Sequence, residues 1–480
     1  MRALATLAIA AALSAAVALG APLTSLPGLT SPLPSKMYSG YITVDETTGR
    51  EIFYIFVESY NSPSTDPVSL WLTGGPGCSG LMAAFQEAGP FTMNFTANGA
   101  GVELNPYTWS NAMSMIYIES PVGVGFSNVP GQSSYTTGDA QTANDTYAFM
   151  QGFYKQYPQF KPNDFWVTGE SYGGHYVPEI VNRILDGNIA ANTTGDFTIP
   201  IKGWMVGNPW TDPETEAWGV VQNWWDRAII GREDWDAIQA TCDYKSITFW
   251  IINNASAGAM RTPQQQAAWW TAHYAEAKEK GLFLPGSNPE ACFKALYEAS
   301  DVEFKNVDIL GVYRDVCVPG VQQYPDQINP CASTQLTEYL NRADVRTALH
   351  ASLTVPQVWA GCSSPPTLTY STYDTQQSVL YIYERAWRET DLKILVYSGD
   401  NDAIVPYTGT RMWIQKAGRP TVKKNHQWFA DTNGMQVAGW ATQYDKFTFA
   451  TVRGAGHLVP YMKPHRALAL IQGFLANHTL

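Results

Sequence analysis

Charge is scarce in this sequence, and positive charge is scarcer than negative charge. Only 15% of the 480 residues are Asp, Glu, Lys or Arg, and 30 Lys and Arg stand against 42 Asp and Glu, a formal net charge of −12. This balance argues against nucleic acid or an anionic membrane as a partner, because both are bound chiefly through basic surface. The low charge and the ordinary glycine and proline contents also exclude a disordered, collagen-like or coiled-coil chain.

Long hydrophobic runs are absent after the first twenty residues. Arg2 is followed by an Ala/Leu-rich run from Ala3 to Leu19, and Ala18–Gly20 is a small-x-small cleavage sequence, which is typical of a secretory signal peptide. An uncleaved membrane anchor is the alternative interpretation. We therefore expect a signal peptide over residues 1–20, no membrane anchor after its removal, and a secreted or vacuolar location.

Cysteine is infrequent, and no CxxC pair suggests a zinc or redox site. An even number of cysteines in an exported chain predicts three disulfides, formed by Cys78, Cys242, Cys292, Cys317, Cys331 and Cys362. Five Asn-x-Ser/Thr sequons are candidate glycosylation sites, at Asn94, Asn144, Asn192, Asn254 and Asn477. Both features fit passage through the secretory pathway.

Short apolar runs, each stopped by turn residues, indicate strands. They are Tyr41–Val44, Glu51–Val57, Ser69–Leu72, Met113–Ile118, Asp164–Val167, Gly203–Val206, Ile394–Tyr397 and Phe447–Val452. The first two read as a hairpin. Helix-length stretches, such as Thr137–Tyr157 and Tyr172–Leu185, separate several of the others. Continuous apolar strands alternating with helices predict an α/β fold with a mostly parallel sheet covered on both faces.

The alternation of strands and helices stops between about residues 210 and 340. This stretch holds eight of the 17 tryptophans and four of the six cysteines, and it includes helical segments such as Pro263–Gly281. We expect a mainly helical, disulfide-bonded insertion. The predicted organisation is therefore a signal peptide, a loose segment or short pro-segment over 21–37, a first core part over 38–209, the insertion over 210–340 and a second core part over 341–480.

The strongest local motif is Gly169-Glu-Ser-Tyr-Gly173, which lies between a predicted strand and a predicted helix. In such an elbow, glycines allow a tight turn that exposes the serine, here Ser171, at the N-terminus of the helix. A serine nucleophile needs a base and an acid that orients the base. In the α/β-hydrolase arrangement they follow in the order Asp, His on loops after strands, and Asp402 and His457 occupy such loops, with Asp400 as the competing acid.

The sequence resembles the serine carboxypeptidases, a family with yeast vacuolar, plant and lysosomal members. The resemblance is carried by seven stretches between about residues 38 and 475, of which those around Ser171 and His457 are the most specific. They are Trp71–Ser79 with Glu87–Pro90, Glu119–Ser127, Gly169–Pro178, Gly207–Pro209, Leu340–Val345, Gly399–Asp402 and Gly454–Pro460. It implies an α/β-hydrolase fold, and a serine-type peptidase that needs no metal or cofactor.

The resemblance also implies catalytic roles. Ser171 would be the nucleophile, His457 the general base and Asp402, the second aspartate of its Asp-x-Asp triplet, the orienting acid. The backbone amides of Gly75 and Tyr172 would form the oxyanion hole. The glycine-dense segment around Gly75 could, judged by itself, also be a plain tight turn.

Substrate recognition is implied in the same way. Glu170 and Glu87 would form a close carboxyl pair that keeps a proton and binds the substrate's terminal carboxylate, which favours acidic pH. Thr73 stands where the family usually has Asn; threonine can donate one hydrogen bond but has a shorter reach, so the departure bears on how strongly the terminal carboxylate is selected. Leu458 and Met82 would line the pocket of the leaving residue, and both are apolar, so apolar C-terminal residues are expected.

The family pattern further pairs Cys78 with Cys362 and leaves the other four cysteines to pair within the insertion, in an order that the sequence does not give. The expected partners are peptide or protein C-termini, and the oligomeric state stays open. Two alternatives to a peptidase remain at this stage. One is an esterase or acyltransferase on the same scaffold, and the other is a catalytically silent binding protein.

Overall fold

The computed structural model describes residues 20–96, 99–195, 197–255, 274, 277–303, 307–318, 328–353, 358–431 and 434–476. The predicted signal peptide, apart from Gly20, and the sequon at Asn477 lie outside these residues, as does most of the predicted helix Pro263–Gly281. The side chains of Asn94, Asn192 and Asn254 lie outside them as well. No helix in the described ranges is both long and apolar enough to cross a membrane.

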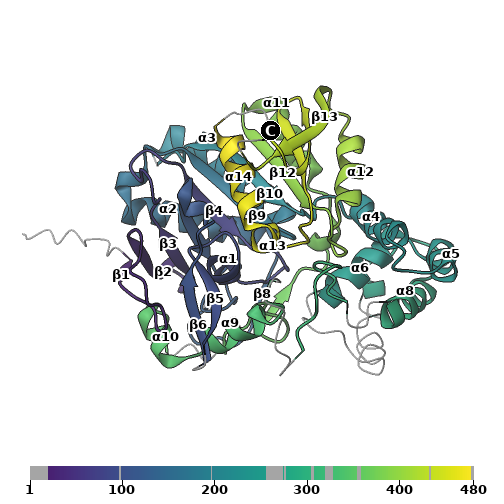
Figure 1. Cartoon of the computed structure of the whole chain (residues 1–480), viewed down its shortest axis with the longest axis horizontal. Helices are drawn as coiled ribbons and strands as arrows, with labels where there is room; N and C mark the ends of the chain where they lie inside the picture. Colours follow the sequence, from purple (N-terminus) through teal and green to yellow (C-terminus); the bar gives the residue numbers. More distant parts are fainter. Residues whose placement is uncertain are drawn as a thin grey trace, which may run out of the picture.

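An eleven-stranded sheet forms the centre of the molecule (Figure 1). Its middle strands are parallel to one another, while the strands at both edges pair antiparallel. The order is β1 (Ala21–Leu23), β2 (Met37–Asp45), β3 (Arg50–Val57), β7 (Ser114–Ile118), β4 (Val68–Leu72), β9 (Phe165–Glu170), β10 (Ile201–Gly207), β12 (Lys393–Gly399), β15 (Phe447–Val452), β14 (Val437–Tyr444) and β13 (Thr421–Phe429). The predicted mostly parallel sheet is confirmed.

Both faces of the sheet are buried, and two separate apolar clusters show why the central strands read as continuous apolar runs. Alternate residues of β3 enter opposite clusters, with Tyr54 on one face and Ile55 on the other. One face is covered by α2 (Asp139–Gln156), α3 (Gly173–Thr194), α11 (Leu380–Glu389) and α12 (Tyr407–Ala417). The other is covered by α1 (Gly80–Gln86), α9 (Ala332–Leu340), α10 (Ala343–Ala348), α13 (Val459–Met462) and α14 (Pro464–Leu475).

Several strands have no counterpart among the sequence-based predictions. They are the hairpin of β5 (Phe91–Thr96) and β6 (Gly99–Leu104), the parallel pair β8 (Tyr135–Thr137) and β11 (Leu368–Tyr370), and the edge hairpin β13–β14. The β13 sequence is mostly exposed and contains two lysines, so it lacks the apolar run that marks a buried strand. The expectation of a loose segment over 21–37 is wrong for its first part, because β1 pairs with β2 and both Leu23 and Leu26 are buried.

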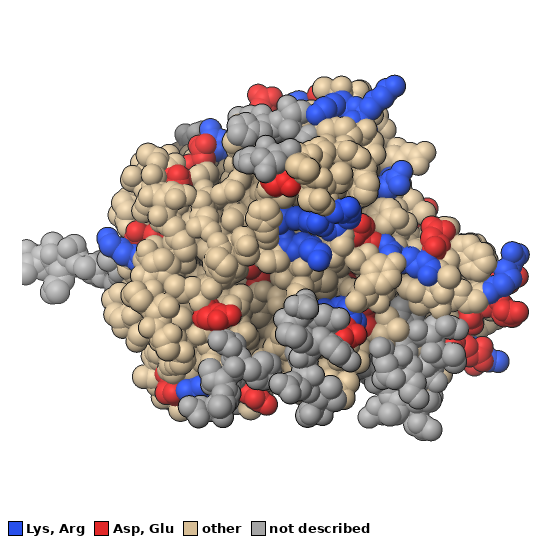
Figure 2. Space-filling model, in the orientation of Figure 1, with Lys and Arg blue, Asp and Glu red and all other residues tan. Residues whose placement is uncertain are grey.

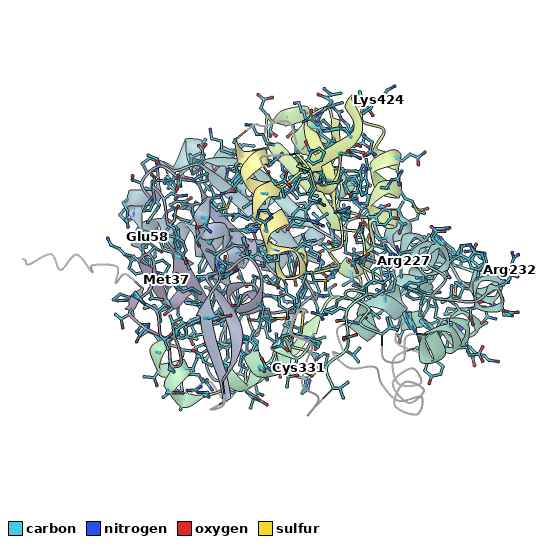
Figure 3. The ribbon with its side chains drawn as sticks, viewed as in Figure 1. Met37, Glu58, Arg227, Arg232, Cys331 and Lys424 are labelled. Atoms are coloured by element: carbon cyan, nitrogen blue, oxygen red, sulfur yellow. A yellow bond between two sulfur atoms is a disulfide. The ribbon has the colours of Figure 1, made fainter. Side chains whose placement is uncertain are left out.

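Helices replace strands in the region expected to be an insertion. From residue 208 to residue 367 the described residues form α4 (Pro213–Asp226), α5 (Arg232–Thr241), α6 (Tyr244–Ala255), α8 (Pro289–Glu303), α9 and α10, and no strand. Figure 1 shows α4, α5, α6 and α8 projecting together from one side of the sheet, whereas α9 lies apart and packs against α1 and the β5–β6 hairpin. In Figure 3, Arg227 marks the base of this projection and Arg232 its outer end.

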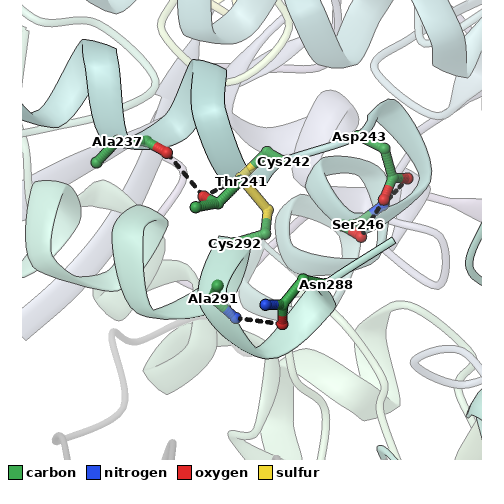
Figure 4. Close-up of a disulfide and its surroundings, with 8 residues drawn as sticks. All are labelled: Ala237, Thr241, Cys242, Asp243, Ser246, Asn288, Ala291 and Cys292. Carbon is green, nitrogen blue, oxygen red and sulfur yellow. Dashed lines mark hydrogen bonds between the residues drawn. A yellow bond between two sulfur atoms is a disulfide. The ribbon is translucent and has the colours of Figure 1, made fainter. Parts of the chain in front are cut away.

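Two disulfides stabilise this helical region. Cys242, at the end of α5, is bonded to Cys292 in α8, and Figure 4 shows the helix ends around them. Thr241 donates a hydrogen bond to the carbonyl of Ala237 (2.7 Å), and the side chain of Asn288 accepts one from the amide of Ala291 (3.2 Å). The second disulfide is Cys317–Cys331. The four insertion cysteines therefore pair among themselves, as expected.

Charged side chains are sparse on the face of the molecule shown in Figure 2, and many of them gather over the outer helices of the projection. This distribution agrees with the low charge content of the sequence. Uncharged residues therefore form most of this face of the strand-and-helix body.

Candidate active site

The site is built where adjacent parallel strands end. Ser171 follows β9, Asn208 follows β10, Asp402 follows β12 and His457 follows β15, and these four strands are neighbours in the sheet. The carboxyl ends of parallel strands lie at one edge, which is where open α/β sheets place their ligands. Residues nearly 300 positions apart are thereby brought to one edge of the sheet.

Ser171 lies on the predicted strand–turn–helix elbow. Its φ is 61°, a left-handed conformation that is uncommon outside glycine and marks a strained turn. The turn is fixed from both sides, since the Ser171 amide donates to the Gly207 carbonyl (3.0 Å) and its carbonyl accepts from the Trp210 amide (2.9 Å). A Cβ at Gly169 would lie 2.4 Å from the Leu72 carbonyl oxygen, so glycine is required there. The serine is partly exposed, while Glu170 and Tyr172 beside it are buried.

Asp402 and His457 are in direct contact, with 2.7 Å between Oδ2 and Nδ1. Asp402 is completely buried and also accepts hydrogen bonds from the amides of Ile404 (2.8 Å) and Val405 (3.2 Å). With Nδ1 donating to the carboxylate, the Nε2 atom of His457 is left as the basic nitrogen. Asp400, the competing acid, instead accepts from the Gly454 amide at 2.7 Å.

Two residues that the sequence reasoning gave no role also hold this pair. Asn208 donates from Nδ2 to Asp402 Oδ2 at 2.7 Å, and its Oδ1 accepts from the Gly399 amide at 3.0 Å. The sequence did contain a pointer to Asn208, because the Gly207–Pro209 stretch carries part of the resemblance and follows a predicted strand. The second is Leu310 of the insertion, whose carbonyl accepts from the His457 amide at 2.6 Å. A backbone acceptor leaves no signal in a sequence.

The insertion segment around Leu310 contacts the acid loop too. The Ala403 amide donates to the Ile309 carbonyl (3.0 Å), and the Val312 amide donates to the Asn401 carbonyl (3.1 Å). Together with the His457 bond, these contacts join one helical-region segment to both loops that carry the Asp–His pair. This segment of the insertion therefore helps to hold the loops of Asp402 and His457 in place.

The glycine-dense loop after β4 packs against the elbow. A Cβ at Gly74 would lie 2.4 Å from the Tyr172 amide nitrogen and 2.6 Å from Ser171 Cβ, so the two backbones touch and only glycine fits. Among the described residues, no hydrogen bond from the amide of Gly75 or Tyr172 to another residue is found. Two such amides beside a serine can stabilise an oxyanion.

Glu87, at the end of α1, and Glu170, at the end of β9, are both fully buried and interact with each other. Burial raises the pKa of Glu87 to about 7, and burial together with the Glu87 charge raises that of Glu170 well above its usual range. Two such carboxyls cannot both ionise cheaply, so the pair keeps a proton. Thr73, which directly precedes Gly74 in the glycine-dense loop, is also buried, and its hydroxyl accepts from the Trp71 indole at 2.9 Å.

The remaining predicted site residues lie around this centre. Leu458 is buried directly after His457, and Met82 is half-buried on α1 beside Gly361. Cys78 is disulfide-bonded to Cys362, the pairing that the resemblance implies. This bond joins the glycine-dense loop to the chain that returns from the insertion. No group of three His, Cys, Asp or Glu side chains able to hold a metal occurs within the described part of the chain.

A cavity of about 910 Å³ lies elsewhere, between β13 and the end of α14. Pro67, just before β4, and Ala112, just before β7, are among the residues that line it. These positions mark the amino ends of the parallel strands, opposite to the edge with Ser171. The cavity is therefore not part of the candidate active site.

Residues 27–477 match the family model described as serine carboxypeptidase. The chain belongs to the serine carboxypeptidase family. Serine carboxypeptidase-like 34 of Arabidopsis thaliana is 35% identical over 95% of this chain and 88% of its own length. Serine carboxypeptidase 24 of the same plant is 33% identical over 93% and 90%.

A solved structure agrees with this family assignment at the level of the fold. The crystal structure of a prohormone-processing carboxypeptidase from Saccharomyces cerevisiae has a TM-score of 0.70 to this chain at 19% identity, covering 95% of this chain and 94% of that one. The family's α/β-hydrolase fold is thus the fold of this molecule. Membership also makes the chain a serine-type carboxypeptidase, a hydrolase that acts on peptide bonds.

Proposed function

We propose that this serine carboxypeptidase releases the C-terminal residue of peptides through an acyl-enzyme, at acidic pH and with a preference for apolar C-terminal residues. Ser171 Oγ attacks the last peptide carbonyl while His457 Nε2 takes its proton. The negative oxygen that develops accepts hydrogen bonds from the amides of Gly75 and Tyr172. The imidazolium then protonates the departing amine, and water, activated by the same histidine, hydrolyses the acyl-enzyme.

The observation that carries this proposal is the buried Glu87–Glu170 pair next to the nucleophile. Glu170 directly precedes Ser171, and a protonated carboxyl there can donate a hydrogen bond to the terminal carboxylate of a substrate. Thr73 can donate a second one, because its oxygen already accepts from Trp71 and its hydroxyl hydrogen is available. An esterase that ignores the terminal carboxylate has no need of a buried proton at this place.

The apolar preference is proposed from Leu458 and Met82. An apolar wall offers a Lys or Arg head group no counter-charge and removes its hydration, which is costly. A Leu or Phe side chain instead gains about 1.5–3 kcal/mol if it becomes fully buried.

The site can also pass an acyl group to an acceptor other than water, and this acyltransferase reaction is the alternative.

Three further expectations from the sequence are also proposals. They are a signal peptide that directs the enzyme to the secretory pathway, the division of the chain at about residues 209 and 340, and glycosylation at the sequons. Asn144 is exposed on α2, where its side chain accepts a hydrogen bond from Arg183 (2.8 Å). Peptide mapping of the protein secreted by a eukaryotic host tests both the mature N-terminus and the occupancy of Asn144.

The deciding experiment compares blocked dipeptides with free and with amidated C-termini between pH 4 and pH 8. We expect hydrolysis of the free acid to exceed that of the amide at acidic pH by about a hundredfold in kcat/KM. Equal rates on both substrates would contradict the proposed recognition of the terminal carboxylate and favour the esterase alternative. Efficient transfer of the acyl group to an added alcohol, with little hydrolysis, would favour an acyltransferase.

A further inference from the structure

A second buried acid lies close to the elbow, and it belongs to neither the catalytic pair nor the carboxyl pair. Asp139 is the first residue of α2 and is 8% exposed. Its Oδ1 accepts hydrogen bonds from the hydroxyls of Tyr172 (3.0 Å) and Tyr370 (2.5 Å). Its Oδ2 contacts His175 Nδ1 at 3.1 Å. Three side chains, from the elbow, α3 and β11, thus meet at the carboxylate of one α2 residue.

One branch of this cluster ends on the elbow itself. Tyr172 directly follows Ser171, its ring is 1% exposed and stacks on the ring of His175 with centroids 4.6 Å apart. The side chain of Tyr172 is therefore held by a hydrogen bond at its tip and by ring packing along its face. Holding this side chain fixes the Tyr172 backbone amide, which is one of the two proposed oxyanion donors.

The other branch ends on the glycine-dense loop. The Gly77 amide donates to the hydroxyl of Tyr176 at 3.2 Å, and Tyr176 packs against the rings of Tyr172 (5.1 Å) and Tyr370 (6.1 Å). The hydroxyl of Tyr370, which bonds to Asp139, also interacts with that of Tyr176. Gly77 lies two residues after Gly75, the second proposed oxyanion donor. Both halves of the oxyanion hole are thus connected to the same carboxylate.

The charge state of Asp139 suits this role. Burial by itself would raise its pKa, but the bond and charge of His175 and the hydroxyls of Tyr370 and Tyr172 lower the pKa below its usual value. A buried carboxylate that stays ionised is costly unless its donors remain in place. Rearranging either tyrosine therefore costs free energy, and this cost restrains the cluster.

His175 does not form a second catalytic dyad with Asp139. It is completely buried within α3, and its Nε2 has no hydrogen-bond partner among the described residues. In the described part of the chain, no hydrogen bond therefore links this nitrogen to Ser171. The arrangement has the contacts of an Asp–His pair without access to a substrate.

We propose that Asp139, acting through Tyr172 and through the Tyr370–Tyr176 pair, is a positioning residue that fixes both amide donors of the oxyanion hole. This inference rests on the proposed function, since it assumes that Ser171 is the nucleophile. Its effect falls on the transition state, because the oxyanion exists only there and in the tetrahedral intermediates.

The test uses single-atom changes in the full-length enzyme. Tyr172→Phe and Tyr370→Phe each remove one hydroxyl from Asp139, and Asp139→Asn removes the charge. Tyr154→Phe is the matched control, because Tyr154 is also fully buried and its hydroxyl has no hydrogen-bond partner among the described residues. The measurements are the fraction of sites titrated by an organophosphonate, kcat per titrated site, KM, and inhibition by a peptide aldehyde.

We expect kcat per titrated site to fall by about tenfold in each Tyr→Phe variant and by up to about a hundredfold in Asp139→Asn. KM should stay within about twofold, and the aldehyde inhibition constant should rise by the same factor as kcat falls. Tyr154→Phe should match the wild type. A purely structural role would lower the titrated fraction and the Tm but leave kcat per titrated site unchanged, and that result overturns the inference.

The two proposals fail in different ways. If the phosphonate labels no Ser171 in the wild type, the proposed function fails whatever the variants do. If Ser171 is labelled but kcat per titrated site is unchanged in both Tyr→Phe variants, only the positioning role of Asp139 fails. The Tyr→Phe variants decide the matter if Asp139→Asn does not fold.

Discussion

The chain contains two Asp–His pairs near Ser171 whose direct contacts are almost the same. In each, a histidine Nδ1 meets a carboxylate Oδ2, at 2.7 Å for His457–Asp402 and at 3.1 Å for His175–Asp139. Both aspartates are buried and both histidines are at most 5% exposed. Neither the distance nor the burial separates the proposed catalytic pair from the proposed supporting one.

The surroundings of the two pairs do separate them. Asp402 and His457 lie on loops at the carboxyl ends of parallel strands, and backbone amides hold the acid. Asp139 and His175 lie inside helices, and tyrosine hydroxyls hold the acid. The comparison teaches that the place of an Asp–His pair in the fold, and not its direct contact, distinguishes the two pairs.

The largest expected difference between the two pairs is in the effect of replacing their histidines, His457 and His175. We expect Ser171→Ala and His457→Ala to lower kcat by about four to six orders of magnitude while the fold stays intact, because they carry bond making. His175→Gln should lower kcat by no more than about tenfold, since glutamine keeps a donor for Asp139. Steady-state rates corrected for folded protein by circular dichroism measure both. Near-normal turnover in His457→Ala would remove the serine mechanism.

Leu458, the residue after the proposed catalytic base His457, provides the second test, because no such pocket role is proposed beside His175. We expect wild-type enzyme to prefer C-terminal Leu or Phe over Lys or Arg by about ten- to a hundredfold in kcat/KM, because Leu458 follows His457 at the site. Leu458→Glu should shift the preference toward basic residues by supplying a counter-charge. A panel of blocked dipeptides measures this, with Leu458→Gln as the uncharged control. Release of Arg as fast as Phe by the wild type would show that Leu458 only packs in the core.

The Glu87–Glu170 pair differs from the two Asp–His pairs in its expected charge. Each aspartate accepts hydrogen bonds from several donors, which favour its ionised form, whereas the two glutamates lack such donors among the described residues. Burial raises the pKa of Glu87 to about 7 and that of Glu170 well above its usual range, so the pair is uncharged at acidic pH and becomes negative as Glu87 ionises above about pH 7. We expect KM for substrates with a free C-terminal carboxylate to rise about tenfold between pH 5 and pH 8, because the negative charge that the pair gains repels the carboxylate. KM for ester substrates without that carboxylate should change less. Parallel pH profiles of KM for the two substrate types would count against this ionisation of the pair.

The smallest expected effect is on stability. Glu119 is fully buried, accepts hydrogen bonds from Ser79 and Trp359 at 2.7 Å each, and has its pKa raised to about 7 by burial. A carboxyl whose folded-state pKa exceeds its unfolded value stabilises the fold at acidic pH, and this contribution disappears as pH rises through about 7. We therefore expect a Tm about 5 °C higher at pH 5 than at pH 8.

Glu119→Gln should narrow that difference, and Glu233→Gln, at an exposed position on α5, should leave it unchanged. Differential scanning calorimetry at the two pH values measures all three proteins. A Tm that rises from pH 5 to pH 8 would contradict the assignment of protonated buried glutamates.

Much of the fold could be predicted because the central strands are buried on both faces and so carry uninterrupted apolar runs. The edge hairpin β13–β14 could not, since half-exposed edge strands keep polar residues and resemble loops. The three strand-end loops with Ser171, Asp402 and His457 had local signals in glycine and chain order. Leu310 and the Asp139 cluster had none, because a carbonyl contact and a meeting of residues from α2, α3 and β11 exist only in three dimensions.

The central claim is that Ser171, activated by Asp402–His457 and not by Asp139–His175, is the nucleophile. Its most direct test is mass spectrometry of the protein after treatment with an organophosphonate. We predict one adduct, on Ser171, that is lost in His457→Ala and retained in His175→Gln. An adduct on another residue, or its loss from both variants alike, would contradict the claim.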